Sequence, residues 1–108
     1  MKFNMQGIME QAQKMQEEVE RVKEEASRKR VTADAGGGMV SVVMTGANEL
    51  VEIKIAKELI NPDEVEMLED LIIAAVNKAN NNAKEMFQED MQKVTGMLPN
   101  IPGLNFGL

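Results

Sequence analysis

Apolar side chains recur at alternating steps of three and four residues along the N-terminal part of the chain. Gln, Glu, Lys and Arg fill most positions between them, and these residues are strong helix formers. The spacing holds for three heptads and predicts an amphipathic helix over about residues 4–28. Its apolar seam consists of Met5, Ile8, Ala12, Met15, Val19, Val22 and Ala26. A seam this narrow needs a partner helix, either from the same chain or from another.

The middle of the chain changes from helical spacing to an alternation of apolar and polar residues. Three consecutive glycines, Gly36 to Gly38, separate two such stretches, and Gly46 closes the second. Glycine tolerates positive φ, so the triple glycine predicts a tight hairpin turn. A third stretch covers residues 50–55, and together the three predict an antiparallel meander. The apolar faces of the two later strands are Val40, Val42 and Met44, and Val51, Ile53 and Ile55.

A glycine-rich loop that binds phosphate is the alternative interpretation of the triple glycine. Such a loop requires Lys followed by Ser or Thr, and then a helix whose N-terminus holds the anion. Here Met39, Val40, Ser41 and Val42 follow, which is a strand pattern. The sequence therefore favours a structural hairpin.

A second long helix is predicted from Asn61 to about residue 94. Asn61 is a good N-cap, Pro62 suits the first helical position, and Glu64 adds an acid to the first turn. The run from Leu71 to Val76 is apolar all round, which predicts that this part of the helix is buried. Residues 97–108 contain prolines and glycines among Leu, Ile and Phe. We therefore expect one domain over residues 1–96 and a flexible, partly docking tail over residues 97–108.

Composition excludes most catalytic chemistry. The chain has no histidine and no cysteine, and its only serines are Ser27 and Ser41. A Ser/His/Asp triad and a thiol nucleophile are therefore excluded, so an enzyme would have to use carboxylates and lysines alone. We predict no enzymatic activity and no cofactor. Six acids between Glu58 and Asp70 lack the pattern of a calcium loop, so no metal site is predicted. The longest apolar run is far too short to span a membrane, which favours a cytoplasmic protein.

The order helix, three strands and long helix, with specific local motifs, resembles the YbaB/EbfC family of bacterial nucleoid-associated proteins. The motifs that carry the resemblance are Gln11–Gln16, Ala35–Val40, Met67–Ala75 and Thr95 with Gly96. The resemblance implies an α+β fold and a cytoplasmic homodimer whose first helices project like the arms of tweezers. It also implies binding to double-stranded DNA at the nucleoid, a change in DNA conformation, and roles in nucleoid organisation and gene regulation. It implies no catalytic residue.

The resemblance places DNA contacts on the projecting first helix. The basic residues there that can serve are Lys14, Arg21, Lys23, Arg28, Lys29 and Arg30. They are assigned by location alone, because the family has no fixed base-reading motif. The sheet cannot cover two apolar helices by itself, so we also expect an obligate dimer. Its expected interface includes Val40, Val42, Leu68, Leu71, Ile72 and Ala75.

The charge distribution predicts weak DNA binding. The net charge is −6, and residues 1–30 hold seven bases against six acids while residues 31–108 hold five against twelve. Affinity that depends on so few bases should fall quickly as salt rises. The alternative function is a protein-binding clamp, in which the methionine-rich seam of the first helix grips a partner helix. The clamp residues in that case are Met5, Ile8, Met15, Val19 and Val22.

Overall fold

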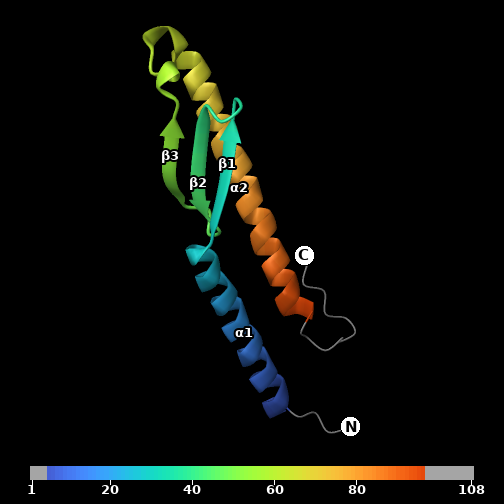
Figure 1. The fold of residues 1–108 in the computed structure, drawn as a ribbon. Helices are drawn as coiled ribbons and strands as arrows, with labels where there is room; N and C mark the ends of the chain where they lie inside the picture. Colours follow the sequence, from blue (N-terminus) through green and yellow to red (C-terminus); the bar gives the residue numbers. More distant parts are fainter. Residues whose placement is uncertain (1–4, 97–108) are drawn as a thin grey trace.

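The protein is an elongated α+β molecule. Along the chain, a long helix comes before a small sheet and a second long helix comes after it. The structure is a computed structural model that describes residues 5–96, with extents of 74 × 23 × 16 Å. The tail predicted over residues 97–108 lies outside the described residues. Figure 1 shows the sheet in one half of the molecule, with one long helix packed along it and continuing past it, and another leading away from it. The elements are α1 (Met5–Arg28), β1 (Arg30–Ala35), β2 (Val40–Thr45), β3 (Leu50–Ile55), the short 3-10 helices η1 (Lys57–Leu59) and η2 (Pro62–Glu64), and α2 (Val65–Gly96).

The three strands form an antiparallel meander in the order β1-β2-β3, as the alternating pattern predicts. Gly36, Gly37 and Gly38 have φ of 65°, 65° and 91°, a region that side chains with a Cβ rarely adopt, so the glycine hairpin is confirmed. The second turn is held by Thr45, whose Oγ1 accepts hydrogen bonds from the backbone N–H groups of Ala47 and Glu49. Local sequence chemistry thus determines both hairpins.

The beginning of α2 differs slightly from the predicted helix start. Asn61 caps it as expected, because its side-chain oxygen accepts a hydrogen bond of 3.0 Å from the backbone N–H of Asp63. The first turn, Pro62–Glu64, is a 3-10 helix, and the α-helix proper starts at Val65. Short 3-10 turns at helix ends are common, because an i→i+3 hydrogen bond satisfies groups that have no α-helical partner.

The hydrophobic core lies between α2 and one face of the sheet. Three alanines spaced four residues apart on α2, Ala75, Ala79 and Ala83, are completely buried. They lie in one cluster with Val40 and Val42 of β2, both buried as the alternating pattern predicts. Because alanine is small, the helix can lie close to the strands and exclude water with few side-chain atoms.

The α2 helix covers β1 and β2 but leaves β3 open (Figure 1). On β3, Val51 and Ile53 keep 53% and 40% of their surface exposed. On α2, Ile73 is 58% exposed, so the prediction that the run from Leu71 to Val76 is buried all round is wrong for the single chain. The reason is that one helix can turn only one face to a sheet.

The α1 helix enters the sheet almost without a linker, since Lys29 alone separates it from β1. The backbone N–H of Gly46 donates to the carbonyl oxygen of Lys29 over 3.1 Å, which joins the helix end to the β2–β3 turn. Of the residues in α1, Val22 and Ala26 are buried, both in its C-terminal third. There α1 contacts α2, so part of the predicted partner helix comes from the same chain.

We predict that Gly46→Ala destabilises the protein by about 1–3 kcal/mol, the usual effect of overpacking a tight contact. A Cβ at Gly46 would lie 2.7 Å from the carbonyl oxygen of Ala26 and 2.5 Å from Cε of Met86, and the first of these is backbone. Gly96→Ala is the control, because a Cβ there meets nothing within 4 Å. Urea unfolding followed by circular dichroism measures both, and equal stability of the two variants would contradict the close packing of α1 against α2.

Candidate nucleic-acid interface

The six basic residues predicted to contact DNA lie on α1 and at its exit into β1, and all are exposed. Lys14, Arg21 and Arg28 are spaced seven residues apart, so they share one flank of the helix at intervals of about 10 Å. Lys23 lies on another side of α1, Lys29 follows its last residue, and Arg30 begins β1. The structure therefore spreads the bases along α1 and its exit into β1, and does not gather them into one patch. We call α1 (residues 5–28) the arm.

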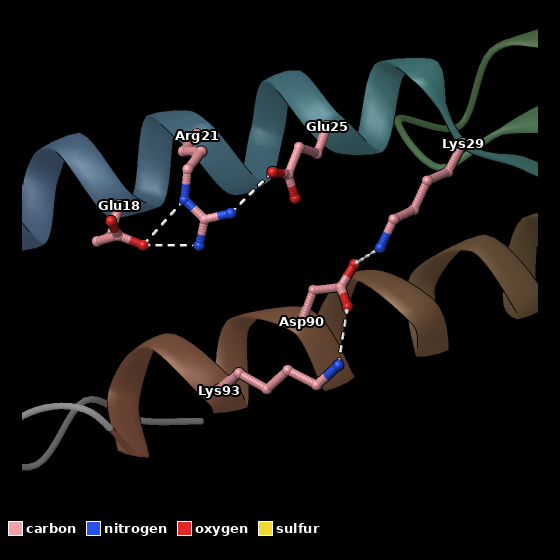
Figure 2. Close-up of polar contacts among 6 residues, drawn as sticks. All are labelled: Glu18, Arg21, Glu25, Lys29, Asp90 and Lys93. Carbon is pink, nitrogen blue, oxygen red and sulfur yellow. Dashed lines mark hydrogen bonds and ion pairs between the residues drawn. The ribbon is translucent and has the colours of Figure 1, made fainter.

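Carboxylates of the same helix surround Arg21. Its Nε and Nη2 donate to Glu18 Oε2 over 3.0 and 2.7 Å, and its Nη1 donates to Glu25 Oε1 over 2.7 Å (Figure 2). The hydrogen bond with Glu18, followed by that with Glu25, raises the pKa of Arg21 above its ordinary value. The guanidinium is therefore always charged, but two acids compete with any phosphate for it.

Arg28 is paired in the same way, while three other bases have no carboxylate partner among residues 5–96. Arg28 Nη2 lies 2.7 Å from Glu24 Oε1. Arg30 donates from Nη1 to the backbone carbonyl oxygens of Ser27 and Lys29, over 3.2 and 3.3 Å. Within residues 5–96, no ion pair involves Lys14, Lys23 or Arg30. These three are therefore the bases most available to phosphate.

Lys29 connects the two helices. Its Nζ lies 2.7 Å from Asp90 Oδ2 on α2, and the Asp90 side chain is only 15% exposed (Figure 2). Lys93 approaches the other carboxylate oxygen of Asp90 at 3.9 Å, and its own side chain is 81% exposed. The role of Asp90 is absent from the sequence prediction, because no local pattern pairs residues 61 positions apart. Lys29 thus has a structural role as well as a place in the predicted interface.

The predicted dimer-interface residues divide into two groups. Val40, Val42 and Ala75 are buried in the core of the chain itself. Leu68, Leu71 and Ile72 are half-buried and pack against that core from α2. Other large apolar side chains are exposed on β3 and on the first half of α2. They include Leu50, Val51, Ile53, Val65, Met67 and Ile73.

Neither a metal site nor a membrane span is found in the part of the chain that the structure describes. No three His, Cys, Asp or Glu side chains are grouped there so that they could hold a metal ion. No helix there is long and apolar enough to cross a bilayer.

The fold and the exposed arm define a class of small α+β proteins in which a long N-terminal helix extends from a three-stranded sheet. The chain belongs to the YbaB/EbfC DNA-binding family, whose model matches residues 1–98. The resemblance noted from the sequence is thereby confirmed. The family is described by DNA binding and not by a chemical reaction.

Curated relatives and a solved structure agree with this assignment. A nucleoid-associated protein of Acetivibrio thermocellus is 52% identical over 101 residues, covering 94% of this chain and 89% of the relative. Another, from Thermoanaerobacter pseudethanolicus, is 52% identical over 102 residues, covering 94% and 91%. The crystal structure of an uncharacterized Helicobacter pylori protein superimposes with a TM-score of 0.74 at 26% identity, over 89% of this chain and 99% of that one.

We predict that Asp90→Asn lowers the free energy of unfolding by about 1 kcal/mol, the upper end of the range typical of exposed ion pairs. The reason is that Lys29 loses its partner across the two helices. Lys93→Gln is the control, since its longer contact and exposure predict almost no effect. Urea titrations at low and high salt measure both variants. Equal effects of the two changes would show that the Lys29–Asp90 contact does not hold the helices together.

Proposed function

We propose that the protein is a homodimer that binds double-stranded DNA at the nucleoid, in the cytoplasm, mainly through the phosphate backbone. Binding changes the conformation of the DNA and serves nucleoid organisation and gene regulation. The observation that carries this proposal is the projecting α1 arm with exposed bases, in a chain that belongs to a DNA-binding family. The nucleoid-associated relatives support the same place of action.

The arm is better suited to contacting DNA phosphates than to recognising nucleobases. Residues 31–108 hold twelve acids and five bases. Attraction for DNA is therefore confined to the arm. Lys14, Lys23 and Arg30 have no carboxylate partner among the described residues, which gives up to three phosphate contacts from each arm. A dimer then neutralises about six phosphates, for which the slope of log affinity against log salt is about −5.

Dimerisation is supported by the apolar surface that the chain leaves uncovered. Val51, Ile53 and Ile73 are large apolar side chains exposed on β3 and α2. Exposed groups of this kind beside an open strand are typical of an association surface. We therefore propose that a second copy covers β3 and the adjacent side of α2. Leu68, Leu71 and Ile72 then lie at this contact, and Val40, Val42 and Ala75 support it from the core beneath.

The protein-binding clamp is the second candidate function. Met5 and Ile8 of its proposed seam are exposed, which favours an apolar partner at the N-terminal end of α1. At the other end, Val22 is already buried in the chain itself, so only part of the seam is open to a partner. A mobility-shift titration with duplex DNA across salt concentrations distinguishes the candidates, because a clamp specific for protein helices gives no shift.

We predict that replacing Lys14, Lys23 and Arg30 together with Gln weakens DNA binding on every sequence and brings the salt slope from about −5 close to zero. Replacing Lys57, Lys78 and Lys84 with Gln is the matched control, because it removes the same charge from exposed sites away from the arm. Fluorescence anisotropy with a labelled duplex measures both. Equal losses in the two variants would mean that net charge, and not the arm, determines affinity.

We predict that Ile53→Asp converts the dimer into monomers at micromolar concentration, because a charge would be buried at the proposed contact without a partner. Thr32→Asp is the control, since Thr32 is exposed and its neighbours Val31 and Ala33 provide the core face of β1. Light scattering coupled to gel filtration gives the mass of each variant. A parent protein that is already monomeric, or an Ile53→Asp variant that remains dimeric, would refute this interface.

A further inference from the structure

Lys29 differs from the other bases predicted to contact DNA, because its carboxylate partner lies outside α1. Its Nζ lies 2.7 Å from Asp90 Oδ2 on α2, so this ion pair joins the exit of the arm to the second helix (Figure 2). The carboxylates that pair with Arg21 and Arg28 lie on α1 itself and move with it. The contact with Asp90 therefore directs the Lys29 ammonium toward the body of the protein.

The backbone of Lys29 is held at the same junction, while its side chain keeps some freedom. The carbonyl oxygen accepts hydrogen bonds from the backbone N–H of Gly46 over 3.1 Å and from Nη1 of Arg30 over 3.3 Å. The side chain is 42% exposed, and a lysine ammonium sits on a flexible four-carbon stem. Without its carboxylate partner, the ammonium would be free to turn toward solvent while the backbone stays in place.

Asp90 is better placed to retain a base than the carboxylates of α1 are. Its side chain is 15% exposed, whereas the glutamates that pair with bases on α1 are 34% to 67% exposed. A sheltered carboxylate is screened less by water and salt than an exposed one, so it competes more strongly with phosphate. Lys93 approaches the other oxygen of Asp90 at only 3.9 Å, which leaves Lys29 as its closer partner.

We propose that Asp90 withholds Lys29 from DNA and thereby limits the affinity of the protein for phosphate. This inference rests on the proposed function, since it concerns the same DNA contact. In the parent protein the bases available to phosphate are Lys14, Lys23 and Arg30, and the Lys29 ammonium neutralises Asp90. When the carboxylate is removed, Lys29 adds one phosphate contact on each chain, next to that of Arg30.

Asp90 thus acts on DNA without touching it, as a positioning residue for Lys29. One ammonium cannot pair fully with Asp90 and with a phosphate at the same time. Attachment of α1 to α2 and binding of DNA therefore compete for Lys29, and the competition acts in both directions. Removing the carboxylate should have opposite effects on the two properties, because the fold loses an ion pair while the DNA gains a contact.

The salt dependence of DNA binding by the full-length protein tests the proposal, with Asp90→Asn compared against Glu89→Gln. Glu89 is the neighbouring acid on α2, is exposed and takes part in no ion pair within residues 5–96, so the control removes the same charge. Fluorescence anisotropy with a labelled duplex gives the affinity of each variant, and circular dichroism shows that each is folded.

We expect Asp90→Asn to steepen the slope of log affinity against log salt by about 2, because the dimer gains two phosphate contacts at about 0.9 each. Its affinity relative to Glu89→Gln should then rise about tenfold as salt is lowered from about 200 to about 50 mM. Equal slopes of the two variants would overturn the proposal and leave DNA binding by the arm intact. A parent protein that binds no duplex at about 50 mM salt would overturn the proposed function together with this inference.

Lys29→Gln identifies the base that is released. Alone it should leave the slope of the parent unchanged, and added to Asp90→Asn it should abolish the gain. If Lys29→Gln alone flattens the slope by about 2, Lys29 already contacts phosphate in the parent and Asp90 does not withhold it. This single variant decides the question even if Asp90→Asn does not fold.

Discussion

The alanine face of α2 packs closely on the first two strands, and the other contacts of the molecule follow from this packing. Ala75, Ala79 and Ala83 are completely buried against a sheet face that includes Val40 and Val42. Small side chains allow close approach, but they also make the contact narrow. One helix that lies close over β1 and β2 cannot also cover β3. The open apolar side chains of β3 follow directly from how the core is packed.

The same contact sets the direction of α2, which continues past the sheet and meets α1. At this junction the packing is tight, because Gly46 leaves no space for a side chain between Ala26 and Met86. The Lys29–Asp90 ion pair lies on the same junction, and Lys29 is the single residue between α1 and β1. With so short a connection, the direction of the arm is coupled to the sheet. An arm of 24 residues is about 36 Å long, so small changes at the junction move its tip by several ångströms.

On the proposed function, the arm also reconciles an acidic protein with DNA binding. Charges more than about 8–10 Å apart in solvent are largely screened at physiological salt, so the free end of the arm is little affected by the acidic body. Along the arm itself, Glu18, Glu24 and Glu25 pair with Arg21 and Arg28. Pairs three or four residues apart stabilise an isolated helix by a few tenths of a kcal/mol each. The arm thus gains helical stability from the same carboxylates that weaken its attraction for phosphate.

Local sequence patterns specify the helices, strands and turns of this protein and the positions of its basic residues. The heptad spacing, the positive-φ glycines and the Asn61 cap act through neighbouring residues, so each was readable without a fold. Even the pairing of Arg21 with Glu18 and Glu25 follows from helical spacing. Which apolar faces are covered depends instead on how α2 packs, because Val51 and Ile53 show the same alternation as Val40 and Val42. The two pairs of residues differ only in whether α2 lies over their strand. The partner of Lys29 was likewise unreadable, because Asp90 comes near it only when both helices pack against one sheet.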